Sequence, residues 1–144
     1  MDSFKFIMAL LFFAVLLFGC NKPNQNAPGY LLGSFEDDYS IQYELNDKVF
    51  LQKPSTRFHI LKWNIEDQYF IAKNDSLNPY DPKLYTRIDW VTFNNMSPFL
   101  WGFCLTTYNA LTADSAENID TVDRENPKTG CNGYPFSRMK PIET

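Results

Sequence analysis

Histidine and cysteine, which supply most zinc ligands and many catalytic nucleophiles and bases, are scarce in this chain. His59 is the only histidine, and the three cysteines are nowhere spaced as Cys-x-x-Cys. So few ligands and bases argue against a metal site and against an activated thiol. The chain also lacks a Gly-x-Ser-x-Gly motif and a glycine-rich phosphate loop. The sequence therefore favours a non-catalytic protein without a metal or cofactor, and carboxylate-based hydrolysis is the enzymatic alternative.

Positive charge is scarce as well. The chain has 13 Lys and Arg residues against 17 Asp and Glu residues, a formal net charge of -4, and no basic cluster. Proteins that bind nucleic acid neutralise its phosphates with a basic surface, so we expect no nucleic-acid partner. The acidic run Glu36-Asp37-Asp38 and the Asx residues Asn74, Asp75 and Asn78 lack the glycine and closing glutamate of a calcium loop. We expect them to have ordinary roles in turns and at strand ends.

Long apolar runs are limited to one, which extends from Phe6 to Phe18 behind a single positive charge at Lys5. As a helix this run would measure roughly 20 Å, whereas the hydrocarbon core of a bilayer is about 30 Å thick. That length is typical of the apolar segment of a secretory signal rather than of a permanent transmembrane helix.

The residues that end this run resemble a known processing motif. Leu17-Phe18-Gly19-Cys20 is similar to the lipobox of bacterial lipoproteins, in which the signal peptide is cut before the cysteine. Leu17, Gly19 and Cys20 match the pattern, and Phe18 departs from it, because a small or β-branched residue is usual there. The resemblance covers residues 1–20 only. The alternative is a cysteine buried in an uncleaved hydrophobic helix.

The resemblance implies where the protein is located. Residues 1–19 would be the signal peptide, and Cys20 would carry a diacylglycerol and an N-acyl chain such as palmitate, enough for stable membrane anchoring. Asn21 is not the aspartate that retains enterobacterial lipoproteins in the inner membrane, so we expect the outer membrane. We expect residues 20–29 to form a flexible tether, because the stretch after Cys20 has no core-forming side chain. Residues 30–144 are then a single domain.

Lipidation of Cys20 would leave an even number of cysteines. Cys104 and Cys131 would share an oxidising compartment, and we expect a disulfide between them. The bond would close a loop of about 28 residues and contribute on the order of 3.5 kcal/mol. Two free thiols are the alternative.

Apolar residues alternate with polar ones from residue 39 onward, which is the pattern of half-buried strands. Short turns separate these segments, and the pattern predicts six strands at residues 39–45, 48–52, 57–63, 68–74, 84–93 and 99–108. Short loops between successive strands favour an antiparallel meander. We therefore predict a mainly β fold, curled into a barrel or half-barrel.

The end of the chain has a different pattern. Residues 111–119 are the one helical candidate, with Thr112 as N-cap. The rest is rich in Gly, Pro and Asn, and we expect an irregular segment pinned to the sheet through Cys131, with Tyr134 and Phe136 packed against the sheet.

Aromatic residues make up 17% of the chain, and Trp63, Trp90 and Trp101 all fall on predicted strands. In a curled sheet such rings fill the interior. The functional alternative is a cleft with aromatic walls for an apolar ligand, or exposed rings that stack on sugar. A ring on a strand face is compatible with both.

Arg87 and Asp89 are two residues apart and therefore lie on one face of their strand. Ion pairing and hydrogen bonding between strands is the interpretation we favour. A polar pair inside an aromatic barrel could instead orient a ligand, which makes Trp63, Arg87, Asp89, Trp90 and Trp101 the candidate ligand-binding residues.

The sequence thus predicts a lipid-anchored envelope protein with a small β-barrel-like module that binds or inhibits without catalysis. The expected fold resembles small lipocalin-like barrels and the small barrel lipoproteins that inhibit lysozyme, a likeness of fold that does not fix function. The ligand could be a small apolar molecule, a sugar or a protein. A structural envelope lipoprotein is the main alternative, and a small hydrolase is the other.

Overall fold

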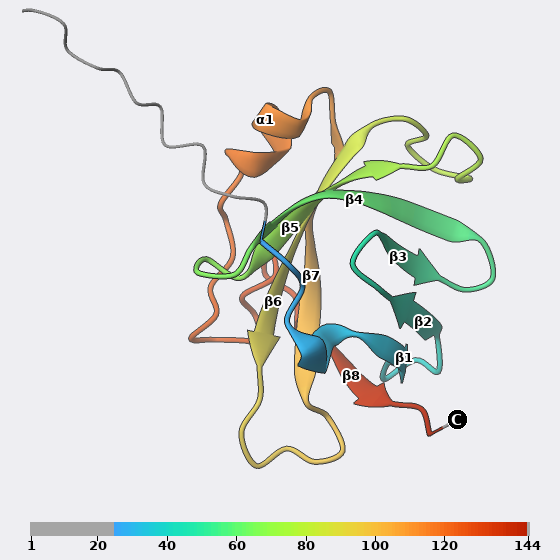
Figure 1. The fold of residues 1–144 in the computed structure, drawn as a ribbon. Helices are drawn as coiled ribbons and strands as arrows, with labels where there is room; N and C mark the ends of the chain where they lie inside the picture. Colours follow the sequence, from blue (N-terminus) through green and yellow to red (C-terminus); the bar gives the residue numbers. More distant parts are fainter. Residues whose placement is uncertain (1–24, 144) are drawn as a thin grey trace, which may run out of the picture.

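Residues 25–143, which the computed structural model describes, form an eight-stranded antiparallel barrel (Figure 1). Each strand pairs with its neighbours in sequence, and the first pairs with the last to close the barrel. The strands are β1 (Gly33–Glu36), β2 (Gln42–Leu45), β3 (Val49–Gln52), β4 (Thr56–Asn64), β5 (Tyr69–Asn74), β6 (Tyr85–Thr92), β7 (Trp101–Ala110) and β8 (Ser137–Pro141). A short 3-10 helix, η1 (Gly29–Leu31), precedes β1, and α1 (Ala113–Glu117) follows β7.

The predicted signal peptide and Cys20 lie outside the described residues. Within residues 25–143, no helix is both long enough and apolar enough to cross a membrane.

The mainly β fold and its meander are confirmed, and the predicted strands correspond to β2–β7. Sequence reasoning missed β1 and β8, and the expected irregular tail is wrong for Ser137–Pro141, which is strand. Both strands are short, and each has a single fully buried side chain, Phe35 in β1 and Met139 in β8. A period of two cannot be recognised from one inward position.

The acidic run at the end of β1 secures the seam between β1 and β8. Glu36 lies opposite Lys140 and forms an ion pair with it at 2.9 Å. Asp38 accepts two hydrogen bonds from Arg138, at 2.9 and 2.7 Å. The buried carboxylate of Asp37 closes the following turn by accepting hydrogen bonds from two backbone N–H groups and from the hydroxyl of Tyr43. All three carboxylates therefore act in the fold.

Aromatic side chains fill the interior of the barrel. Phe50 lies near the centre and contacts Phe58, Phe70 and Phe103, with ring centroids 5.2–6.1 Å apart. The buried cluster around it consists of Leu31, Phe35, Tyr43, Leu45, Phe58, Trp63, Phe70, Ala72, Ile88, Trp90, Trp101, Phe103 and Met139. Because these side chains pack against one another across the interior, they leave little room for a ligand along the barrel axis.

A β-bulge in β4 brings Trp63 into this interior. Phe58 and Ile60 face inward, and strict alternation would then turn Lys62 inward and Trp63 outward. The register between β4 and β5 shifts between Ile60 and Lys62, so that Leu61 is the extra residue. The shift reverses the alternation, which buries Trp63 and exposes Lys62.

The segment before β1 closes one end of the barrel. Leu31 of η1 is fully buried in the core, and the hydroxyl of Tyr30 accepts a hydrogen bond from the indole N–H of Trp90 at 3.1 Å. Gln25 and Ala27, which belong to the predicted tether, form hydrogen bonds with Ile65 and Asp47. The described part of that tether thus lies against the barrel. We call this end the closed end.

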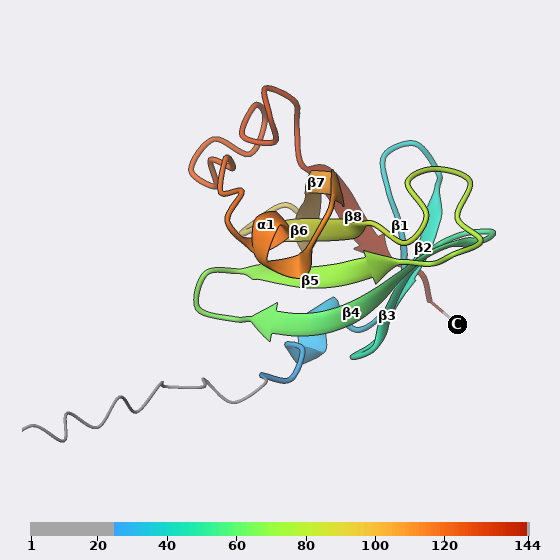
Figure 2. The ribbon, with the colours of Figure 1, turned by 90° about the horizontal axis from the view of Figure 1, so that it is seen from above.

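Residues 111–136, here the β7–β8 connection, lie on the outside of the barrel, with α1 beside β5, β6 and β7 (Figure 2). Thr112 caps α1 through a reciprocal pair of hydrogen bonds with Ser115, as the sequence predicted. The disulfide between Cys104 and Cys131 is present, with Cα atoms 5.5 Å apart. Phe136 is buried beside it, whereas the expected packing of Tyr134 is wrong, because its side chain is 74% exposed.

Candidate functional site

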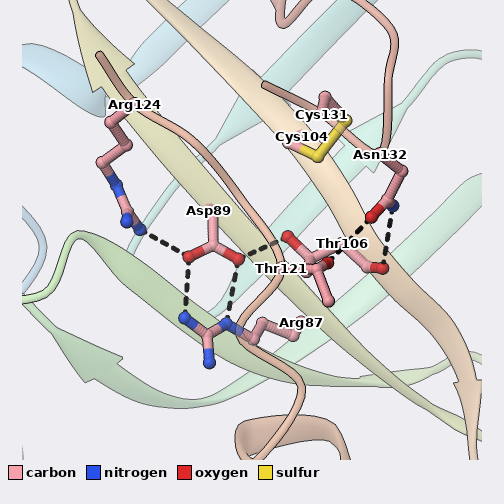
Figure 3. Close-up of a disulfide and its surroundings, with 8 residues drawn as sticks. All are labelled: Arg87, Asp89, Cys104, Thr106, Thr121, Arg124, Cys131 and Asn132. Atoms are coloured by element: carbon pink, nitrogen blue, oxygen red, sulfur yellow. Dashed lines mark hydrogen bonds and ion pairs between the residues drawn. A yellow bond between two sulfur atoms is a disulfide. The ribbon is translucent and has the colours of Figure 1, made fainter. Parts of the chain in front are cut away.

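The five residues predicted to bind a ligand do not form one site. Trp63, Trp90 and Trp101 lie in the packed interior. Arg87 and Asp89 lie on the other face of β6, so they point out of the barrel and under the β7–β8 connection (Figure 3). The barrel wall therefore separates the tryptophans from the charged pair.

Asp89 is the centre of a buried hydrogen-bond network on the outside of β6. Its carboxylate is 0% exposed and accepts a fork of two hydrogen bonds from Arg87, both at 2.9 Å. Arg124 and the hydroxyl of Thr106 also donate to it. Thr106 lies two residues after Cys104, the partner of Asp89 across the sheet, and therefore faces the same side as Asp89. The two arginines and the hydroxyl offset the free-energy cost of burying this carboxylate.

The two arginines use their remaining N–H groups to hold the β7–β8 connection. Arg87 donates to the carbonyl of Glu117 at 2.6 Å and to the carboxylate of Asp120 at 3.1 Å. Arg124 donates to the carbonyls of Trp90 and Gln68. Burial lowers the pKa of Arg87, but the hydrogen bond and charge of Asp89 outweigh this effect, so the pKa is raised and the guanidinium stays charged. The network therefore acts as a clamp for the connection.

A polar cavity of about 640 Å³ lies beside this clamp, between α1 and the β4–β5 turn. Glu117 lines it and accepts hydrogen bonds from the hydroxyl of Tyr69 and the ammonium of Lys62. Burial raises the pKa of Glu117, but these two donors outweigh it and leave the pKa lowered. A general acid needs a raised pKa, so the shift of Glu117 does not fit that role.

A second cavity, of about 560 Å³, lies at the end of the barrel opposite η1, and we call it the mouth. Its floor consists of Phe58 and Leu105, which belong to the top of the packed core. Its walls come from the β3–β4 turn, the β5–β6 loop (residues 75–84) and the end of β7. The remaining lining residues are Gln52, Thr56, Asn74, Asn78, Pro79, Tyr80, Asp81 and Tyr108. The size and the mixed apolar and polar lining are typical of a ligand pocket.

Two buried asparagines fix the wall of the mouth. Asn78 binds the backbone of Arg57 twice, since its amide oxygen accepts from the N–H and its amide nitrogen donates to the carbonyl, each at 2.8 Å. Asn74 donates to the carbonyls of Asp81 and Tyr108, both at 2.8 Å, and accepts from Thr86. Asn74 thereby joins the β5–β6 loop to β7. These bonds hold the wall in place before any ligand arrives.

The rim of the mouth exposes aromatic rings. Tyr80 is 82% exposed and Tyr108 is 50% exposed. Asn74 donates hydrogen bonds to the backbone carbonyl of Tyr108 and to that of Asp81, which follows Tyr80. Within the described part of the chain, no hydrogen bond or ion pair occupies the side chains of Gln52, Thr56 and Asp81. Rings and free polar groups on a fixed wall are what a binding site requires.

Sequence reasoning missed the mouth. It left residues 75–83 as the connection between two predicted strands but gave no role to Tyr80, which stands between Pro79 and Pro82 in "NPYDP". A bulky ring in a stretch that cannot continue a ladder has no strand face on which to be buried. The position of Tyr80 in such a stretch could therefore have indicated an exposed ring.

No family model, curated protein or solved structure matches this chain. Among the described residues, no group of three or more His, Cys, Asp and Glu side chains is arranged to hold a metal ion.

Proposed function

We propose that this chain is a lipid-anchored binding module of the bacterial envelope that captures its ligand at the mouth without catalysis. Anchoring would be through Cys20 in the outer membrane, and the barrel would present the mouth to the surrounding space. The module would be a receptor or inhibitor that binds its ligand through non-covalent contacts alone.

One observation carries the binding part of this proposal. Among residues 25–143, aromatic side chains fill the interior and η1 closes one end, whereas the cavity above Phe58 is open and has a fixed wall. The exposed rings of Tyr80 and Tyr108 support it, because both line this cavity and can contact a ligand that enters it.

The anchor is tested by Cys20→Ser. We expect this change to block cleavage and to leave a larger precursor without acyl chains, because the thioether cannot form. Metabolic labelling with radioactive palmitate, read together with the apparent mass on a gel, measures both effects. A Cys20→Ser protein that is cut normally and still carries label would refute the lipid anchor.

The binding site is tested in living cells by placing the photoreactive residue p-benzoylphenylalanine at position 80. Its benzophenone reacts with C–H bonds of protein, lipid or sugar alike, so the test does not need to assume the ligand. We expect irradiation to yield a defined adduct in mass spectrometry. The same residue at position 134, which is comparably exposed but lies away from the mouth, is the matched control. Equal or greater adduct yield at position 134 would refute the mouth as the binding site.

A further inference from the structure

We infer that the mouth takes a carbohydrate, an uncharged oligosaccharide of pyranose rings bound at one end. This inference rests on the proposed function, since it names the ligand of the same site. Three features of the mouth carry it: its depth, its charge and the mixture of groups on its rim.

The depth of the mouth argues against long apolar ligands. Phe58 and Leu105 form its floor, and the ring of Phe58 contacts Phe50, which in turn contacts Phe70 and Phe103. An acyl chain bound by a barrel needs an apolar channel along the axis, and here aromatic rings occupy that space. The ligand therefore stays in the outer part of the barrel, partly in contact with water.

The charge of the mouth argues against phosphorylated ligands. No lysine or arginine among residues 25–143 lines it, and Asp81 contributes a carboxylate. Nucleotides, nucleic acids and phospholipid headgroups need cationic donors to balance their phosphates. Peptides that bind by adding a strand need an open sheet edge, and this barrel has none because β1 pairs with β8.

The groups on the rim fit a pyranose ring. A pyranose presents C–H groups on its faces, which pack on an aromatic ring, and hydroxyl groups at its edge, which both donate and accept hydrogen bonds. Tyr80 and Tyr108 supply the rings. Gln52, Thr56 and Asp81 supply an amide, a hydroxyl and a carboxylate that the protein itself leaves unused. The cavity of about 560 Å³ is in the range of pockets for ligands as large as a short oligosaccharide.

Saturation-transfer NMR tests the assignment on the acylated protein purified in detergent micelles, with N,N′,N″-triacetylchitotriose, maltotriose and mannotriose as uncharged probes. We expect at least one of them to receive saturation on its ring C–H protons. Tyr80→Ala combined with Tyr108→Ala should weaken the binding roughly tenfold or more, because the stacking contacts are removed. Tyr134→Ala, which removes an exposed ring that does not line the mouth, should bind as the unmodified protein does.

Binding by none of the three sugars, or unchanged binding by the double alanine variant, would overturn the carbohydrate assignment. Circular dichroism of the double variant must retain the unmodified spectrum, and because both rings are exposed we expect that it does. If the sugars fail while the photoreactive residue at position 80 still captures an envelope component, the carbohydrate assignment falls and the mouth remains the binding site. If both fail, the proposed function falls as well.

Discussion

Replacement of Asp89 by alanine is expected to lower the free energy of unfolding by about 3–5 kcal/mol, the usual effect of breaking a buried ion pair. The carboxylate is fully buried and accepts from Arg87, Arg124 and Thr106, while Arg87 is itself buried. Its removal leaves a buried guanidinium without its main counter-charge. The midpoint of urea unfolding, followed by tryptophan fluorescence, measures the change.

The matched control is Asp120→Ala. Asp120 also pairs with Arg87, but its side chain is 68% exposed, so we expect a loss of no more than about 1 kcal/mol. Amide hydrogen exchange should also accelerate first in the β7–β8 connection of the Asp89→Ala protein, because the clamp joins that connection to β6. Similar urea midpoints for the two variants would show that Asp89 does not have this role.

Removal of the disulfide is expected to have the next largest effect. Cys104 and Cys131 are 27 positions apart in the sequence, and a loop of that length corresponds to about 3.5 kcal/mol in the chain-entropy treatment. We expect the double variant Cys104→Ala/Cys131→Ala to lose about this much stability. An unchanged midpoint of unfolding would show that the other contacts of the connection suffice.

The same variant should loosen the connection before the barrel. Hydrogen bonds from the amide of Asp123 to Gly130 and from the amide of Phe136 to Pro127 hold the segment around Cys131, and the bond to Cys104 fastens that segment to β7. The amides of Asp123 and Phe136 should therefore exchange faster, while those of β2–β5 keep their protection. Equal acceleration throughout the chain would contradict this order.

Sequence reasoning succeeded where a pattern is local and repeated. The alternation of apolar and polar residues predicted strands at 39–45 and 84–93, and the structure contains them as β2 and β6. The disulfide followed from the number of cysteines and the expected export, and the structure contains it. Such features can be predicted from neighbouring residues or from the number of residues of one type.

Features that depend on distant parts of the chain could not be predicted. Closure of the barrel joins Glu36 to Lys140, more than a hundred positions later, and neither strand has a pattern of its own. The prediction that Arg87 and Asp89 share one face of their strand was correct. Whether that face points into or out of the barrel depends on the curl of the sheet and on the connection that covers it. The mouth exists because Asn74 joins two segments 34 positions apart.

A comparison of the two ends of the barrel decides whether the mouth is the binding site. Tyr108 at the mouth and Tyr30 at the closed end are about equally exposed, at 50% and 46%, so that a photoreactive residue at either position meets solvent to the same extent. We expect position 108 to capture the same envelope component as position 80, and position 30 to capture none of it. Capture of that component at position 30, with little at position 108, would contradict the assignment of the mouth as the binding site.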